Sequence, residues 1–197
     1  MASSAGSRTL YDPSALKALA NPLRQKILRR LALDGPATSA ILARALGVTT
    51  GGTSYNLRIL AEHGFVEETP ERARGRERWW RVVRQDLRLP PGARQSGETR
   101  AAVEEIQRLW FATDLEMLDR HLREQDTAAE WAQAPPYSRG TICVTPAELA
   151  AFVEDYIGLV KRYQRPEHYA PPDARTVLTR FMAFPAPADS GDQDPGR

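Results

Sequence analysis

The sequence predicts a mainly α fold that contains one β-hairpin, followed by a small α/β extension. Two observations predict the first part: three short amphipathic helices with start and stop residues between Asn21 and Gly64, and two strand-like segments directly after them. The prolines and glycines of residues 87–97 separate this part from a long helical pattern. We therefore expect a first domain over residues 11–86, a linker over residues 87–97 and a second domain over residues 98–184. Residues 1–10 and 185–197 are expected to be disordered tails.

The first helices are expected from their capping residues. Asp12-Pro13 opens a short helix over residues 13–20. Asn21-Pro22 opens the next helix, because asparagine caps well and proline at the first helical position loses no hydrogen bond. Gly35-Pro36 ends this second helix, whose apolar face is formed by Leu23, Ile27, Leu28 and Leu31.

Two further helices follow, with a short turn between them. Thr38 caps the first and Gly47 ends it, with Ile41, Leu42, Ala45 and Leu46 facing inward. Thr49 caps the second, which spans residues 49–63 and buries Thr53, Leu57 and Leu60. Two helices joined by a short turn that contains glycine form a helix-turn-helix, in which the second helix enters the major groove of DNA.

The outer face of residues 49–63 supplies the candidate base-reading residues. Arginine can pair with guanine and asparagine with adenine, whereas serine and threonine can donate or accept. Gly51 and Gly52 in the first turn either let a phosphate approach the helix N-terminus closely or mark a poorly optimised helix start. The candidates are Thr50, Gly51, Ser54, Tyr55, Arg58 and, at the margin of the face, Asn56.

An arginine-rich hairpin follows the third of these helices. Residues 65–68 and 78–83 are expected as strands, and residues 70–78 between them as a wing. Trp79 and Trp80 lie on opposite strand faces, so one is expected in the core. A charge run is often only a solvated face, but directly after a helix-turn-helix it favours contact with phosphates or the minor groove. The residues assigned to this contact are Arg24, Thr49, Arg72, Arg74, Arg76 and Arg78.

At this point the chain resembles the ArsR-type winged helix-turn-helix regulators. The resemblance covers residues 12–84 and is carried by NPLRQKIL, LARALGV, SYNLRIL and HGFVEE, followed by GRERWWRVV. The chain is most similar to the long members common in actinobacteria, whose C-terminal region has no metal site. This family often has histidine at the position of Asn56, so the chain departs from the pattern there. The resemblance implies a homodimeric transcription regulator without enzymatic activity.

A long helix is expected over residues 98–125, with two apolar stripes. A surface helix needs only one stripe. The surplus predicts that this helix packs both on its own domain and on a second copy of the chain. The predicted dimer interface consists of Leu16, Leu19, Val103, Ile106, Trp110 and Met117. The second apolar stripe of the helix, beside the first, consists of Phe111, Leu115, Leu118 and Leu122.

The C-terminal region is expected to be a small α/β unit. Thr145-Pro146-Ala147-Glu148 is a capping box that opens a helix, and residues 141–144 and 175–184 are expected as strands. The aromatic side chains of this half form a core or line an effector pocket; they are Trp110, Trp131, Tyr137, Phe152, Tyr156, Tyr163, Phe181 and Phe184.

The net charge of +2 hides an asymmetry between the two halves. Residues 1–97 carry 16 Lys+Arg and 8 Asp+Glu, a net charge of +8. Residues 98–197 carry 11 Lys+Arg and 17 Asp+Glu, a net charge of −6. A basic first half suits a domain that follows DNA phosphates.

The single cysteine, Cys143, excludes an internal disulfide and favours a reducing compartment; we expect its thiol to be buried in a strand. No apolar run is long enough to cross a bilayer, and the N-terminus lacks the apolar core of a signal peptide. The protein is therefore expected in the cytoplasm, without a membrane partner.

Metal and catalytic signals are weak. Residues 39–46 contain no metal-ligating side chain, and His121 near Asp114 and Glu124 is more often a surface histidine than a ligand. We expect no enzyme activity and no metal or other cofactor, although an organic effector stays open. The expected partners are double-stranded DNA with an inverted-repeat operator and a second copy of the chain. The alternative is a winged-helix module for protein–protein assembly without specific DNA binding.

Overall fold

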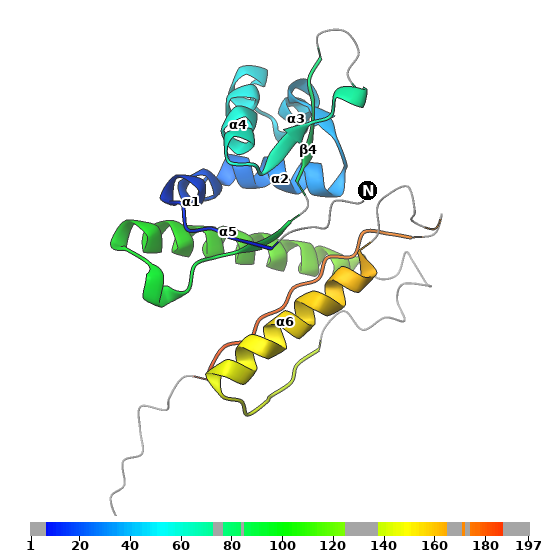
Figure 1. Cartoon of the computed structure of the whole chain (residues 1–197). Helices are drawn as coiled ribbons and strands as arrows, with labels where there is room; N and C mark the ends of the chain where they lie inside the picture. Colours follow the sequence, from blue (N-terminus) through cyan, green and yellow to red (C-terminus); the bar gives the residue numbers. More distant parts are fainter. Residues whose placement is uncertain are drawn as a thin grey trace, which may run out of the picture. The chain divides into compact units, whose positions relative to one another are not determined.

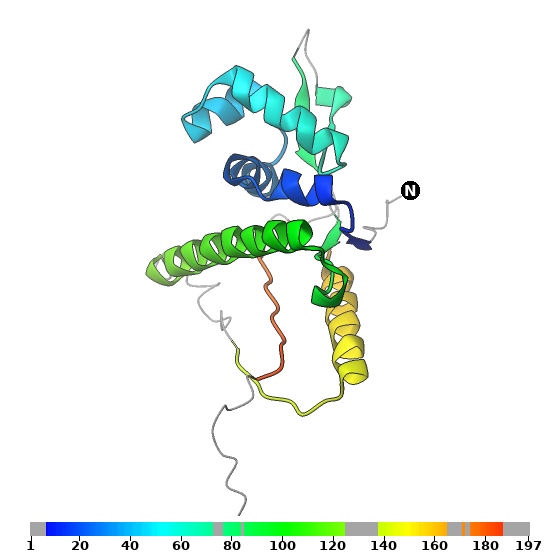
Figure 2. The ribbon, with the colours of Figure 1, turned by 90° about the vertical axis from the view of Figure 1, so that its left-hand side faces the viewer.

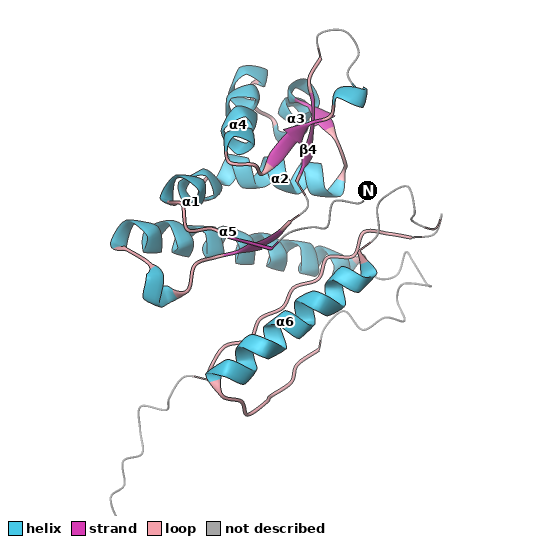
Figure 3. Cartoon of the chain, in the orientation of Figure 1, coloured by secondary structure: helices cyan, strands magenta, loops and turns pink. Residues whose placement is uncertain are grey.

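The computed structural model describes residues 7–72, 77–83, 85–124, 138–164, 171 and 174–186. The chain divides into two compact units, Met1–Ala134 and Pro135–Arg197, and each is considered by itself. Figure 1 shows the elements along the chain, and Figure 3 distinguishes helices, strands and loops. Within the described residues, no helix is both long and apolar enough to span a membrane.

The first unit contains five α-helices in the described residues, and the first four begin where their predicted caps place them. They are α1 (Pro13–Leu19), α2 (Pro22–Leu33), α3 (Ser39–Leu46), α4 (Thr50–Glu62) and α5 (Gly97–Arg123). Each of the predicted caps accepts a hydrogen bond from a backbone N–H in the first turn of its helix; these caps are Asp12, Asn21, Thr38 and Thr49. Gly47, with a φ of 66°, takes the left-handed conformation that ends α3.

The two strands that flank the wing belong to a three-stranded antiparallel sheet. The strands β3 (Val66–Glu68) and β4 (Trp79–Val82) form the predicted hairpin, in which Val66 pairs with Val82. The order is β2-β4-β3, so β4 lies in the centre. The outer strand β2 (Ala37–Thr38) escaped prediction, because two residues show no alternation. A 3-10 helix, Pro70–Arg72, follows β3.

Two predicted boundaries are wrong. Ser7–Thr9 form the strand β1, which pairs in parallel with β5 (Asp86–Arg88), and the side chain of Leu10 is buried. The tail expected over residues 1–10 therefore does not extend to residues 7–10. The linker expected over residues 87–97 begins within β5 and contains a second 3-10 helix, Gly92–Arg94. A three-residue parallel strand is too short to be recognised from its sequence.

The core of the first unit lies between the helices and the sheet. Its largest fully buried side chains include Ile27, Leu42, Leu57, Leu60 and Phe65. The predicted inner stripe of α4 is confirmed, since Thr53, Leu57 and Leu60 are all buried.

The predicted inner face of α3 is partly wrong. Ile41 and Ala45 are exposed, whereas Ala43 is buried beside Leu42. An eight-residue helix buries only a narrow stripe, and apolar content alone does not locate that stripe. Of the two adjacent tryptophans of β4, Trp80 is buried, as expected for one of the pair, and Trp79 is half-buried.

Helix α5 belongs to the first unit, and this changes the predicted dimer interface. Figures 1 and 2 both show α1 and α2 between α5 on one side and α3 with α4 on the other. Four of the six expected interface residues are buried within this chain, so their assignment to a partner surface is wrong: Leu16, Leu19, Val103 and Ile106. Apolar periodicity does not distinguish burial within a chain from burial between chains.

Polar contacts add to the packing of α5. Lys17 of α1 forms an ion pair with Glu98, and Arg29 of α2 forms one with Glu116, with 3.1 Å between Nη1 and Oε2. The indole Nε1 of Trp110 donates to Oε1 of Gln25 at 3.0 Å. Trp110 is therefore half-buried against α2 and not free on the surface.

The second unit contains α6 (Pro146–Tyr163), which begins with the predicted capping box. Residues 141–144 and 175–184 are described and form no strand, so both strands expected there are wrong. Cys143 is exposed, contrary to the expected buried thiol. The ring of Phe181 stacks on Tyr156 with 4.3 Å between centroids and meets Phe152 edge-on at 5.6 Å. Trp131 and Tyr137 lie outside the described residues.

We predict that Ile106→Ala lowers the free energy of unfolding by about 2 to 5 kcal/mol, because it empties a fully buried position. Gln107→Ala replaces an exposed neighbour on the same helix and should change this free energy by less than about 0.5 kcal/mol. Chemical denaturation of both variants at one protein concentration measures the difference. Equal, small effects would contradict the placement of Ile106 in the core.

Candidate nucleic-acid interface

The outer face of α4 is set by the burial of its inner face. Thr53 is fully buried, and its Oγ1 donates to the carbonyl oxygen of Thr49 at 3.0 Å. With Leu57 and Leu60 it holds one side of the helix in the core. Most of the predicted base-reading residues then lie on the opposite, exposed side: Thr50, Gly51, Tyr55 and Arg58 are exposed and Ser54 is half-buried.

The first turn of α4 separates the roles of its two glycines. The backbone N–H of Gly52 donates to Oγ1 of Thr49 at 3.2 Å, and a Cβ added at Gly52 would lie 3.1 Å from the same oxygen. The first turn therefore explains the glycine at position 52, since a side chain there would crowd the capping oxygen of Thr49. A Cβ added at Gly51 meets nothing within 4 Å, so the backbone there is open to close approach from outside. Thr49 serves as the cap of the helix.

Asn56 makes its hydrogen bonds within the protein. Its Nδ2 donates to the carbonyl oxygen of Gly52 at 2.8 Å, and its Oδ1 accepts from Nε of Arg24 at 3.1 Å. Arg24 belongs to α2, so this contact joins two helices. Burial lowers the pKa of Arg24 below its ordinary value, an effect that nearby Tyr55 opposes. Within the described part of the chain, no carboxylate pairs with Arg24.

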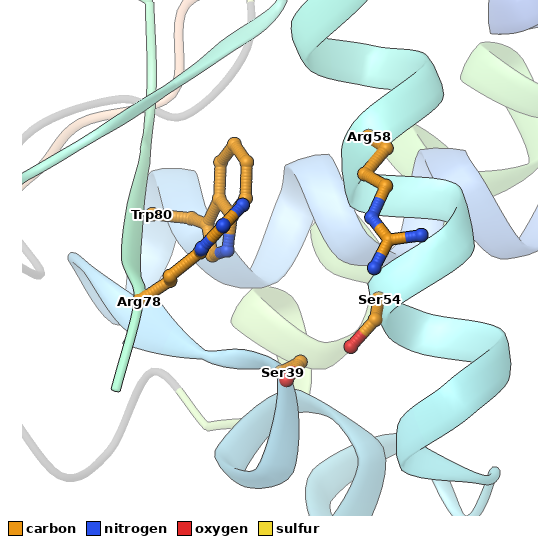
Figure 4. A pocket seen from close by; sticks show the side chains of 5 residues that line it. All are labelled: Ser39, Ser54, Arg58, Arg78 and Trp80. Carbon is orange, nitrogen blue, oxygen red and sulfur yellow. The ribbon is translucent and has the colours of Figure 1, made fainter. Parts of the chain in front are cut away.

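A shallow hollow lies between α4 and the β2-β4-β3 sheet. Its volume is about 210 Å³, and Figure 4 shows the side chains that line it. Arg58 and Ser54 come from α4, Arg78 and Trp80 from the β4 side, and Ser39 from the start of α3. Two guanidinium groups thus border one hollow at the surface. Such an arrangement can receive an anion or a polar base edge.

The arginines near the wing differ in how far they are neutralised. Arg81 donates to Glu67 at 2.7 Å, and this hydrogen bond raises the pKa of Arg81. Arg78 lies 3.4 Å from Glu68 in a pair that is largely exposed. Arg58 and Arg72 have no ion pair within the described residues. The predicted wing residues Arg74 and Arg76 lie outside those residues.

Sequence reasoning missed two members of this surface. Ser39 and Trp80 line the hollow, although neither was assigned to DNA contact. The hollow forms only where β4 and the start of α3 lie next to α4, and no local sequence pattern predicts that these segments are neighbours.

The histidine that was considered as a metal ligand lies on the surface of the described structure. His121 is exposed near the end of α5. No three His, Cys, Asp or Glu side chains in the described part of the chain are placed to share a metal ion.

Residues 19–69 match a family model described as a helix-turn-helix domain. A search of the curated proteins found no match. Similar solved structures include reduced HlyU from Vibrio cholerae, which is 26% identical; the match covers 49% of this chain and 85% of that one, with a TM-score of 0.32.

Two further solved structures are similar to this chain. An ArsR family transcriptional regulator is 24% identical, with 54% and 93% of the two chains covered and a TM-score of 0.31. A transcriptional regulator from Thermotoga maritima is 14% identical, with 76% and 84% covered and a TM-score of 0.32. Residues 19–69 of this chain match the helix-turn-helix domain model, and with the β2-β4-β3 sheet they form a winged helix-turn-helix.

Proposed function

We propose that the protein is a dimeric, sequence-specific DNA-binding transcription regulator whose helix α4 enters the major groove. One observation carries the proposal. The inner face of α4 is buried in the core, and its outer face presents Arg58, an exposed cation without an ion pair in the described residues. An unneutralised arginine on the second helix of a helix-turn-helix is placed to meet the edge of a guanine.

The residues around α4 divide into base-reading and backbone-contacting groups in this proposal. Arg58, Ser54, Thr50 and Tyr55 face a base edge, and the open backbone at Gly51 allows a phosphate to come close. The backbone group consists of Arg24, Thr49, Arg72 and Arg78, together with Arg74 and Arg76, which are assigned from the sequence alone. The net charge of +8 over residues 1–97 supports this division, because phosphate contacts supply much of the affinity for DNA.

The dimer part of the proposal rests on the exposed stripe of α5. Phe111, Leu115 and Leu122 are 50%, 67% and 51% exposed, while Met117 and Leu118 beside them are half-buried. Large apolar side chains in one stripe along a helix are typical of an interaction surface. We therefore propose that this stripe forms the contact between two copies, together with Met117, which the sequence also placed in the dimer interface. Two paired α4 helices would read an inverted repeat with half-sites about 34 Å apart.

We predict that Arg58→Ala weakens binding to the preferred DNA sequence by about 1 to 3 kcal/mol and weakens binding to random DNA much less. The preferred sequence is obtained by repeated selection from a random duplex pool with the unmodified protein. Fluorescence anisotropy then measures both affinities. Arg100→Ala, which removes an exposed arginine of α5, serves as the matched control and should leave the preference unchanged.

Selection that enriches no sequence would contradict a specific regulator and favour the assembly module. Equal losses on preferred and random DNA would instead make Arg58 a phosphate contact.

For the dimer, we predict that Leu115→Glu converts the protein to a monomer, because a charge replaces an apolar side chain in the stripe. Sedimentation velocity at micromolar concentration measures the state. Ile41→Glu places the same charge at an exposed apolar position of α3 and should leave the dimer intact. A monomeric unmodified protein would contradict this part of the proposal.

A further inference from the structure

Both polar ends of the Asn56 amide are occupied within the protein. The Oδ1 atom accepts from Arg24 and the Nδ2 atom donates to the carbonyl oxygen of Gly52. Recognition of adenine by asparagine needs the same two atoms facing outward together. Reading a base with these two atoms would therefore compete with both hydrogen bonds.

The partner of Asn56 is an unneutralised cation. Arg24 is half-buried, and within the described residues it has no carboxylate partner. Partial burial of a charge without a counter-charge is unfavourable, and its effect appears in the lowered pKa of this guanidinium. Only Nε is used in the bond to Asn56, so the terminal nitrogens of Arg24 are left to meet an anion from outside.

The position of Arg24 indicates which anion this is. Arg24 is the third residue of α2, and its side chain reaches Asn56 of α4. Asn56 lies four residues after Gly52 and directly after the exposed Tyr55. A cation held at the margin of a helix in the major groove faces the phosphates that border that groove.

We infer that Asn56 is a positioning residue, which holds the guanidinium of Arg24 ready for a DNA phosphate and reads no base. This inference rests on the proposed function, since it needs α4 to dock on DNA. It replaces the assignment of Asn56 to base reading. The orientation of Arg24 before binding reduces the side-chain entropy that is lost when the phosphate is bound.

The test is a double-mutant cycle on a duplex of random sequence, with affinity measured over a series of salt concentrations. Arg24→Ala should weaken binding about tenfold and reduce the slope of log affinity against log salt by about one, for one lost phosphate contact. Asn56→Ala should weaken binding in the same direction on random and selected duplexes alike. The double variant should bind like Arg24→Ala alone, because Asn56 acts through Arg24.

Lys26→Ala is the matched control, since Lys26 is an exposed cation of the same helix without an ion pair in the described residues. It lies about 200° around the helix from Arg24 and should reduce the salt slope less. Thermal unfolding accompanies every measurement. If Asn56→Ala does not fold, Asn56→Ser, whose side chain is too short to reach Arg24, replaces it, and Arg24→Gln removes the charge at similar length.

Four results separate the possibilities. Loss of sequence preference in Asn56→Ala, with unchanged binding to random DNA, would overturn the inference and restore Asn56 as a base reader. Additive effects of the two substitutions would overturn the inference as well. The same holds if Asn56→Ala lowers the melting temperature and leaves the salt slope unchanged. An unmodified protein that binds no duplex would overturn the proposed function, and the inference with it.

Discussion

The burial of one side of α4 is the constraint on which the rest of the surface depends. Successive residues of an α-helix are about 100° apart, so the depth of Thr53, Leu57 and Leu60 fixes the direction of every other side chain of the helix. A rotation by one residue would bury Ser54 and Arg58 and expose the core. The outer face is therefore as well determined as the packing beneath it.

Helix α2 provides the support for this packing. Ile27 and Leu31 are buried on one side of this helix. Its polar side chains contact three neighbouring helices. Arg24 bonds α4, Gln25 bonds the carbonyl oxygen of Leu19 in α1 and the indole of Trp110 in α5, and Arg29 pairs with Glu116 of α5. In the last pair Arg29 is half-buried and Glu116 is exposed, and ion pairs at the protein surface contribute about 0 to 1 kcal/mol.

Full burial of a leucine or isoleucine contributes about 1.5 to 3 kcal/mol. Apolar packing therefore holds the helices together, and the polar contacts set their orientation.

Local chemistry made the helices of the first unit predictable. Asn21, Thr38 and Thr49 act on the N–H groups within three residues, and Gly47 acts on the turn next to it, so each leaves a signal in a short stretch of sequence. The contact of Arg24 with Asn56 joins residues 32 positions apart and leaves no such signal. Asn56 was therefore grouped by its helical position alone.

Two kinds of error have the same origin. The stripe that contains Val103 and Ile106 was correctly recognised as apolar, but periodicity does not say whether its cover is this chain or a second copy. Residues 175–184 alternate like a strand, but a strand also needs a neighbouring strand, which alternation does not supply, and these residues form no strand in the described structure. In both cases the missing information was the identity of the neighbour.

Backbone amide NMR spectra of the labelled protein, recorded with increasing amounts of a random-sequence duplex, test most directly whether the outer face of α4 meets DNA. We predict that the amide signals of Thr50, Gly51, Tyr55 and Arg58 shift most, with further shifts around Arg24 and at the start of β4. The signals of α6 should change little. Shifts confined to α5 and α6, with those of α4 unchanged, would contradict the placement of DNA on this face.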